Sequence, residues 1–290
     1  QVHAASVSDT DILHPLPRQD RRVEFIRESL VELDEALRQR AGRPEAGLIV
    51  VHGRAVEQVP GLARQLGVQS VFANHDYEPG ALARDARVRG ALADAGVALH
   101  TSKDQAIFDR EELQTQAGRP YAVFTPYKNA WLGKLDAFYL KAYPVEPHAG
   151  ALAPRPPAWR RPVPDLAEIG FERTHLAQLP VRAGARGAAS LLGDFLARID
   201  RYHVARDFPA TRGPSYLSVH LRFGTVSIRE LARQAHALSS AGQPGAATWL
   251  SELIWRDFYF QVLANFPHAA DEQGNGHSFR REYEAIAWQE

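Results

Sequence analysis

Residues 48–51 read Leu-Ile-Val-Val, a short apolar run in which most side chains are β-branched. Such a run is typical of a strand that is buried on both faces, as in a parallel sheet. In the segment after Asp20, apolar residues follow one another in steps of three and four. This spacing predicts an amphipathic helix, with the Asp20 side chain as its N-terminal cap. A buried strand next to such a helix is the repeating unit of an α/β domain.

The same alternation continues on both sides of this pair. The further predicted elements are strands at residues 2–7, 70–73 and 97–100, and helices at residues 59–66 and 79–95. Strands that alternate with helices favour parallel pairing through right-handed crossovers. We therefore predict a doubly wound, parallel-sheet α/β domain over residues 1–125.

The character of the sequence changes after this domain. Prolines gather between residues 144 and 164, so little regular structure is expected there. From Ala188 onward, apolar residues recur at helical spacing and the strand pattern does not return. We predict an interdomain linker over residues 126–187 and an all-α domain over residues 188–290.

Composition limits the classes of function. Basic and acidic residues number 34 each, so the formal net charge is zero and nucleic acid must be attracted by a local patch. Cysteine is absent, which excludes disulfides and thiolate metal sites. The sequence has no apolar run of about 20 residues and no opening signal segment, so we expect a cytoplasmic monomer that crosses no membrane. The absence of methionine suggests a fragment or a processed product.

The segment from Trp249 to Tyr259 reads W-L-S-E-L-I-W-R-D-F-Y. At 3.6 residues per turn, Glu252, Trp255, Arg256 and Tyr259 share one helix face. Aromatic rings beside hydrogen-bonding groups suit a pocket for a planar, polar ligand such as a nucleic-acid base. The alternative is an ordinary ion pair between Glu252 and Arg256, with both rings at the edge of a core.

Two other segments have the chemistry to bind phosphate. Residues 213–218 place small and hydroxyl-bearing residues before a predicted helix, which suits either an anion or an ordinary serine cap. Arg206 lies near a predicted helix end, where it could hold phosphate or complement the helix dipole. His75, Asp76 and Glu78 lie together, but the segment lacks a second histidine at ligand spacing, so we predict no metal site.

Several segments, in this order along the chain, resemble the DNA photolyase/cryptochrome family. They are N-H-D-Y-E-P at 74–79, F-T-P-Y-K-N-A-W at 124–131, Y-H-V-A-R-D-F-P-A at 202–210, P-S-Y-L-S-V-H-L-R-F-G-T-V-S at 214–227 and E-L-I-W-R-D-F-Y at 252–259. The resemblance spans nearly the whole chain and is nearest to bacterial class I photolyases of cyclobutane pyrimidine dimers. Relative to that family, the chain lacks the first strand and the C-terminal part.

This resemblance implies light-driven DNA repair. Excited, reduced FAD would donate an electron to a flipped-out pyrimidine dimer in DNA, the cyclobutane ring would split, and the electron would return. The alternatives are a cryptochrome-like photoreceptor that binds FAD without repairing DNA, and an inactive truncated fragment. Because the family's C-terminal part contributes to the flavin site, we expect the chain alone to bind little FAD.

The resemblance also implies roles for individual residues. Glu252 would hydrogen-bond the dimer and Trp255 would stack on it, which makes these two the catalytic positions. The positions that match flavin contacts are Tyr202, Pro214, Ser215, Tyr216, Leu217, Ser218 and Trp249, and those that face DNA are Arg206, Glu252, Trp255, Arg256 and Tyr259. Pro214 and Tyr216 replace a threonine and an arginine that many relatives have. Gly80-Ala81 replaces the Asn-Glu of members that bind a folate antenna. The resemblance therefore allows a second chromophore of folate or deazaflavin type but does not identify it.

Overall fold

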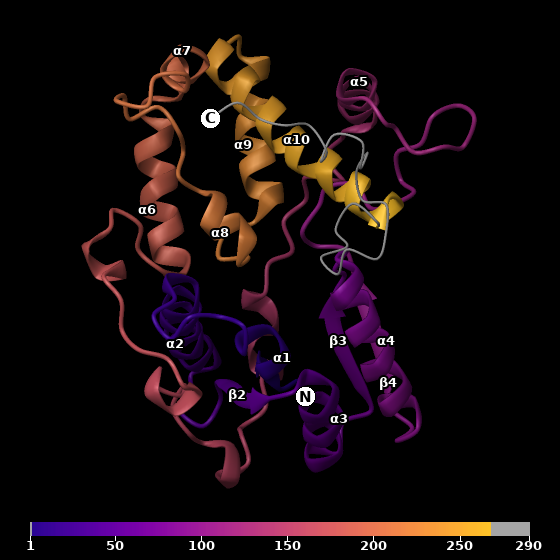
Figure 1. Ribbon diagram of the computed structural model, residues 1–290, viewed down its shortest axis with the longest axis vertical. Coiled ribbons are helices and arrows are strands. Elements are labelled where there is room, and N and C mark those ends of the chain that lie inside the picture. Colours follow the sequence, from indigo (N-terminus) through magenta and orange to yellow (C-terminus); the bar gives the residue numbers. More distant parts are fainter. Residues whose placement is uncertain (1, 268–290) are drawn as a thin grey trace, which may run out of the picture.

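The computed structural model describes residues 2–267, which form an α/β region and a helical region joined by an extended segment (Figure 1). The α/β region alternates strands and helices as predicted. Its elements are β1 (Ala4–Asp9), α1 (Thr10–Leu13), α2 (Arg21–Ala41), β2 (Leu48–Gly53), α3 (Ala55–Leu66), β3 (Ser70–Asn74), α4 (Pro79–Ala93) and β4 (Ala98–Ser102).

Helix α2 begins at the predicted cap. The Asp20 carboxylate accepts a 2.8 Å hydrogen bond from the backbone N–H of Arg22, which satisfies one of the free donors of the first turn. The helix ends at Gly42, whose φ of 61° lies in the left-handed region that glycine adopts without strain. Val23 and Phe25 of α2 are buried, whereas Leu33, one of the apolar residues at helical spacing after Asp20, is exposed.

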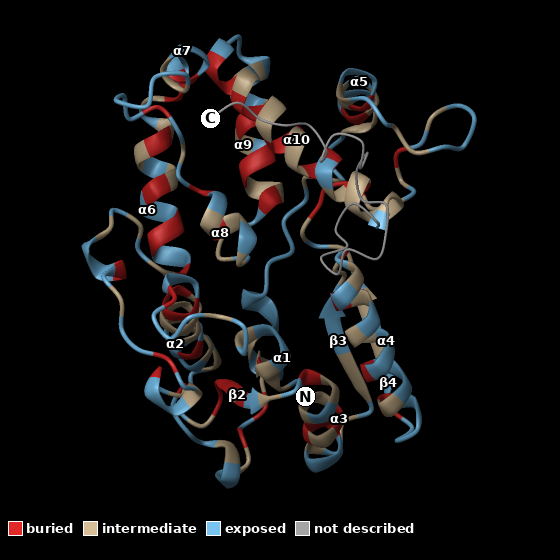
Figure 2. Cartoon of the chain, in the orientation of Figure 1, coloured by how far each residue is buried: buried red, intermediate tan, exposed pale blue. Residues whose placement is uncertain are grey.

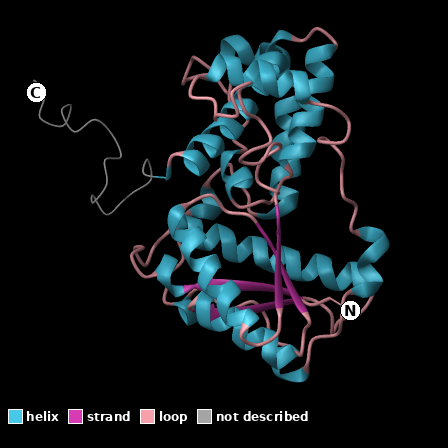
Figure 3. Cartoon of the chain, turned by 90° about the vertical axis from the view of Figure 1, so that its right-hand side faces the viewer, coloured by secondary structure: helices cyan, strands magenta, loops and turns pink. Residues whose placement is uncertain are grey.

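The strands form two parallel pairs instead of one continuous sheet. β1 pairs with β2, with Ala4 opposite Leu48, and β3 pairs with β4, with Ser70 opposite Ala98. Helix α3 carries the chain from one pair to the other, and the two pairs run in different directions in the view of Figure 3. Among the described residues no hydrogen-bonded ladder joins the pairs, so the predicted doubly wound sheet is present as two halves.

The segment between the two regions is more structured than expected at its start. Helix α5 (Phe124–Lys134) begins two residues before the predicted linker and continues into it, and its Tyr127 and Trp131 are buried in the helical core. Its N-cap, Val123, makes no side-chain cap hydrogen bond, so the sequence carries no clear start signal. The proline-rich part beyond it has only short 3-10 turns, which are η1 (Glu146–Ala151), η2 (Pro157–Trp159), η3 (Ala167–Ile169) and η4 (Leu176–Gln178).

A buried ion pair fastens this segment to the α/β region. The guanidinium of Arg155 donates to the Leu48 carbonyl at 3.1 Å and lies 3.6 Å from the carboxylate of Asp34 on α2. Asp34 in turn accepts a 2.8 Å hydrogen bond from the Leu48 N–H. Because both charged groups are buried and mutually satisfied, the linker is held against the edge of β2.

The helical region packs around one apolar core. Its elements are α6 (Gly184–Leu196), η5 (Ile199–Arg201), α7 (Tyr202–Ala205), α8 (Ser218–Arg222), α9 (Ile228–Ser240) and α10 (Pro244–Asn265). Buried residues of α6, α9 and α10 belong to one apolar cluster, and Figure 2 shows the buried positions of these helices in red. Gly245 lets α10 start in contact with η5, since a Cβ there would overlap the Ile199 carbonyl oxygen. In residues 2–267, no helix is long and apolar enough to cross a membrane.

Candidate functional site

Helix α10 carries the predicted functional stripe and is the central element of the helical region. It packs against α5, α7, α9 and η5, and its Leu253, Ile254 and Phe258 are buried. The four residues of the stripe fall on one side of α10, as the spacing predicts, but each meets a different neighbour. The four side chains therefore differ in their contacts.

Glu252 pairs with Arg206 of the segment that follows α7. The Arg206 Nη1 donates to the Glu252 Oε1 at 2.5 Å, and each side chain is about one-third exposed, at 33% and 36%. The guanidinium also lies 5.7 Å from the centre of the Tyr202 ring. The hydrogen bond to Glu252 raises the pKa of Arg206. The structure thus joins two predicted DNA-facing residues that are 46 positions apart, in place of a pair between Glu252 and Arg256.

Trp255 lies in a stack of aromatic rings. Its ring is 3.6 Å from that of Phe124 on α5, with an interplanar angle of 7°. On α10 itself, the Tyr259 ring lies 5.6 Å away at 24°, and the buried Phe258 meets Trp255 edge-on at 5.7 Å. Tyr259 is 61% exposed, so this end of the stack reaches solvent. The sequence analysis missed Phe124, although it begins one of the segments on which the resemblance rests.

Arg256 points away from solvent. Its guanidinium donates to the carbonyl of Gln105, and at 3.3 Å to the carbonyl of Leu221. It also lies 4.6 Å from the centre of the Phe260 ring, and burial lowers its pKa. These contacts bind the guanidinium to the loop after β4 and to α8, whereas the resemblance implies that Arg256 faces DNA.

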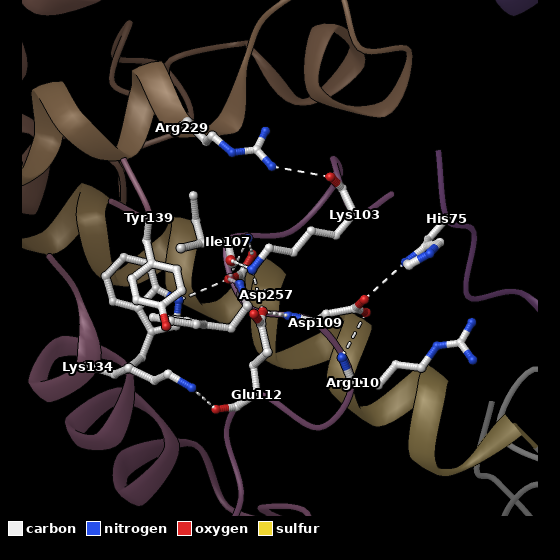
Figure 4. A network of polar contacts seen from close by, with 12 residues as sticks. His75, Lys103, Ile107, Asp109, Arg110, Glu112, Lys134, Tyr139, Arg229 and Asp257 are labelled. Atoms are coloured by element: carbon white, nitrogen blue, oxygen red, sulfur yellow. Dashed lines mark hydrogen bonds and ion pairs between the residues drawn. The ribbon is translucent and has the colours of Figure 1, made fainter. Parts of the chain in front are cut away.

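Asp257 is the buried anchor of α10. Its carboxylate accepts hydrogen bonds from the backbone N–H groups of Ile107 at 3.1 Å and Phe108 at 3.3 Å, and from the Trp131 Nε1 at 2.9 Å. Figure 4 shows this carboxylate at the centre of a polar network. Burial raises the pKa of Asp257 to about 6, although the three donors favour the ionised form.

The same network reaches the ends of β3 and β4. The Gln261 side chain donates to the Asp109 carbonyl at 2.6 Å, and the Asp109 carboxylate lies 3.0 Å from the His75 Nδ1 (Figure 4). Tyr77 donates its hydroxyl to the same carboxylate at 3.0 Å. His75 therefore orients a buried loop, while Glu78 pairs with Arg222. The third residue weighed as a metal ligand, Asp76, accepts hydrogen bonds from the backbone N–H groups of Tyr77 at 2.7 Å and Glu78 at 3.3 Å.

The predicted flavin-contacting residues divide between the core and a loop. Tyr202 and Trp249 are buried, with ring centres 5.5 Å and 4.7 Å from Phe195. Leu217 is also buried, at 1% exposure. Ser218 begins the short helix α8. These contacts give Tyr202, Trp249 and Leu217 a place in the core of the helical region.

The loop before α8 has an uncommon backbone. Tyr216 has a φ of 58°, the one positive φ outside glycine in residues 2–267, and it is 41% exposed. Arg198 holds the loop through the carbonyls of Arg212, Gly213 and Pro214. Ser215 accepts a 3.4 Å hydrogen bond from the Leu217 N–H. A loop with a strained backbone that is held by several hydrogen bonds is typical of a functional site.

Most arginines of the described helical region pair with carboxylates of the protein. The arginines with carboxylate partners are Arg198 and Arg212 with Asp194, Arg206 with Glu252, Arg222 with Glu78, Arg229 with Asp104 and Arg233 with Glu230. Phosphates would have to compete with these pairs. Since exposed pairs contribute only about 0–1 kcal/mol each, such competition costs little.

Comparison with known proteins identifies the family. The family model described as DNA photolyase matches residues 1–148. A deoxyribodipyrimidine photo-lyase of Halobacterium salinarum is 36% identical over 271 residues, which cover 90% of this chain and 54% of that protein. The chain thus spans about half the length of the curated relatives it matches.

Solved structures share the fold. A bacterial class III photolyase from Agrobacterium tumefaciens matches with a TM-score of 0.79 at 24% identity, over 99% of this chain and 57% of that one. An archaeal photolyase from Sulfolobus tokodaii, solved with two FAD molecules, matches with a TM-score of 0.62 at 24% identity, over 100% of this chain and 58% of that one. The matching family model, the alternating α/β region and the helical region that follows it lead to one conclusion: the chain belongs to the DNA photolyase family.

Proposed function

We propose that this chain carries the damaged-base side of a photolyase site, and that the protein splits cyclobutane pyrimidine dimers in DNA under light. The observation that carries the proposal is the grouping of Glu252, Arg206 and Trp255 where α7 meets α10. A carboxylate, a guanidinium and a stacked indole on one surface can recognise a planar base that has left its duplex. Relatives named deoxyribodipyrimidine photo-lyase support the same reading.

Trp255 and Tyr259 supply the stacking surface. Flipping a base out of the duplex costs a few kcal/mol, and the cost is lowest for damaged bases. Stacking on an aromatic ring returns about 1–3 kcal/mol per base. The exposed Tyr259 ring extends the Trp255 surface toward solvent, where an extruded dimer would arrive.

Glu252 reads the edge of the base. Its Oε1 accepts from Arg206, which leaves Oε2 to accept the imide N–H of a flipped pyrimidine. Arg206 holds the carboxylate in place, and its Nε lies 3.5 Å from the exposed Asp207 carboxylate, with which a phosphate would compete. Both residues thus act at one contact between protein and dimer.

The helical region also supplies part of an FAD site. FAD, when bound and reduced, supplies the electron that opens the dimer under light and accepts it afterwards. Tyr202 and Trp249 would form an apolar wall for it, and the hydroxyls of Ser215 and Ser218 would receive its phosphates. The loop around Tyr216 fits this role, because Arg198 binds the carbonyls of Gly213 and Pro214 and so fixes the backbone beside the two serines. We assign no residue of this chain to a second antenna chromophore.

Damage-specific binding tests the proposal. A duplex with one thymine dimer should bind the protein more tightly than the intact duplex, and Trp255→Ala should weaken dimer binding by about tenfold, since one stack is lost. Trp159→Ala, in the linker far from α10 in sequence, is the matched control and should keep the preference. Equal losses of both duplexes in Trp255→Ala would mean that Trp255 serves only the core. Flavin binding without dimer recognition would favour the photoreceptor alternative.

A further inference from the structure

Phe124 makes the closest and flattest ring contact among the described residues. Its ring lies face to face with that of Trp255 at 3.6 Å and 7°, whereas the other ring pairs lie 4.6 Å or more apart. A separation of 3.6 Å is van der Waals contact, so Phe124 covers part of one face of the Trp255 ring system. The two residues are 131 positions apart and come from different helices.

Two hydrogen bonds between α5 and α10 fix the position of Phe124. Lys128 on α5 donates to the Ser251 hydroxyl at 3.2 Å, and Trp131 donates to Asp257 at 2.9 Å. The contact at Ser251 lies one turn before Trp255 on α10, and the contact at Asp257 lies half a turn after it. Phe258 also meets the Phe124 ring at 5.9 Å and 68°, which closes the pair from the side.

Phe124 is the one ring among the described residues that lies on Trp255 at van der Waals distance, because the Phe258 and Tyr259 rings are 5.7 Å and 5.6 Å away. Ser251, Trp255 and Phe258 lie along the row of α10 that α5 covers, because residues three and four apart are neighbours on a helix. Glu252 and Tyr259 belong to the adjacent row on the other side of Trp255. The Tyr259 ring lies 5.6 Å from the Trp255 ring, well beyond the 3.6 Å of the Phe124 contact, and it is exposed. A base that stacks on Trp255 opposite Phe124 would therefore lie beside the Glu252 carboxylate and the Tyr259 ring.

We propose that Phe124 is a positioning residue for damage recognition: it backs the Trp255 indole and fixes its plane so that a flipped pyrimidine stacks on the opposite face. This inference rests on the proposed function and deepens it. Phe124 does not touch the base; it acts by removing the freedom of the indole to rotate. A preset ring loses less conformational entropy when the base arrives, which increases affinity for the extruded base alone.

Binding measurements with two duplexes test the positioning role. Phe124→Ala should weaken binding of a duplex with one thymine dimer by about fivefold, equivalent to about 1 kcal/mol, and change binding of the intact duplex by less than about twofold. Phe124→Tyr keeps the planar ring and should keep the preference. Phe124→Leu keeps apolar volume without a planar ring, so it should lose affinity in the same direction if Phe124→Ala folds poorly. Tyr139→Ala removes a ring from the same core, packed on Phe108 at 4.6 Å, and should leave the preference intact.

A spectroscopic reading separates this inference from the proposed function. With 5-fluorotryptophan incorporated, the Trp255 ¹⁹F resonance is identified by its loss in Trp255→Phe. It should shift and broaden in Phe124→Ala and stay sharp in Phe124→Tyr. A wild-type protein without preference for the dimer would refute the proposed function, whatever the resonance does. A preference that Phe124→Ala leaves unchanged or increases would overturn the inference alone, because Phe124 would then be a passive neighbour or a cover over the base-binding face.

Discussion

The Trp131 indole on α5 donates a 2.9 Å hydrogen bond to the Asp257 carboxylate on α10. The same carboxylate accepts from two backbone N–H groups of the loop that follows β4. One buried side chain therefore joins the α/β region, the start of the linker and the helix that carries Glu252 and Trp255. The geometry of the candidate site depends on this junction.

Removing the Asp257 carboxylate should destabilise the protein strongly. Asp257→Ala leaves three buried N–H donors without an acceptor, which should lower the free energy of unfolding by about 3 kcal/mol. Asp257→Asn keeps one carbonyl oxygen for the donors and should cost less. Urea denaturation at one pH measures both values. Asp257→Ala with wild-type stability would mean that other groups satisfy these donors.

The stability that Asp257 contributes should depend on pH with a definite sign. Burial raises its pKa from 3.8 to about 6, so the folded protein binds the proton more tightly than the unfolded chain does. The favourable contribution is then complete below the unfolded value and is lost as the pH rises through about 6. Relative to Asp257→Asn, the wild type should gain stability when the pH falls from 7 to 5. A difference that stays constant, or that grows toward pH 7, would contradict this.

The start of α10 should tolerate no side chain at Gly245. Gly245→Ala places a methyl group on the Ile199 carbonyl oxygen, and the resulting strain should cost about 1–3 kcal/mol of unfolding free energy. Gly193→Ala on α6 is the matched control, because a Cβ there meets nothing within 4 Å. That substitution should be neutral or stabilise the helix by up to about 1 kcal/mol. Thermal unfolding of the two variants distinguishes them, and equal costs would refute the close packing of α10 on η5.

Arg206 and Glu252 should be coupled in dimer binding. Each single alanine substitution breaks their pair and removes one contact to the damaged base, so the two effects should not add. We expect a coupling energy of about 1 kcal/mol in a double-mutant cycle of dimer affinity. In the cycle of unfolding free energy, the coupling should be smaller, about 0.2–1 kcal/mol, because both groups are partly exposed. Fully additive losses in affinity would mean that Arg206 and Glu252 act separately.

Local sequence signals predicted the α/β elements well because those elements are specified locally. The Asp20 cap and the Leu-Ile-Val-Val run at 48–51 identify α2 and β2 without any knowledge of tertiary structure. Helix α5 lacks such a signal: it has no side-chain cap, and what stabilises it is the burial of Tyr127 and Trp131 against distant residues. The pairing of strands into two halves likewise depends on backbone contacts that periodicity does not encode.

The tertiary contacts of the candidate site could also not be predicted from local sequence signals. Helical spacing placed four residues on one side of α10, which are Glu252, Trp255, Arg256 and Tyr259. Spacing does not predict which other elements pack beside these residues. The loop at 105–109 forms hydrogen bonds with both Arg256 and Asp257. The Arg256 guanidinium is therefore bound within the protein, and the buried Asp257 was not among the predicted site residues. Arg206 was predicted from the resemblance, but its pairing with Glu252 and the stack of Phe124 on Trp255 join residues far apart in the chain, so only the tertiary structure reveals these contacts.

The most direct test of the account is repair itself. The full-length protein, reduced and supplied with FAD, is mixed with a duplex that contains one thymine dimer, and loss of the dimer is followed under blue light and in the dark. We predict loss of the dimer only under light, with a rate that falls by about tenfold or more in Glu252→Ala. Flavin bound to the protein with no loss of dimers under reducing illumination would contradict the proposed function.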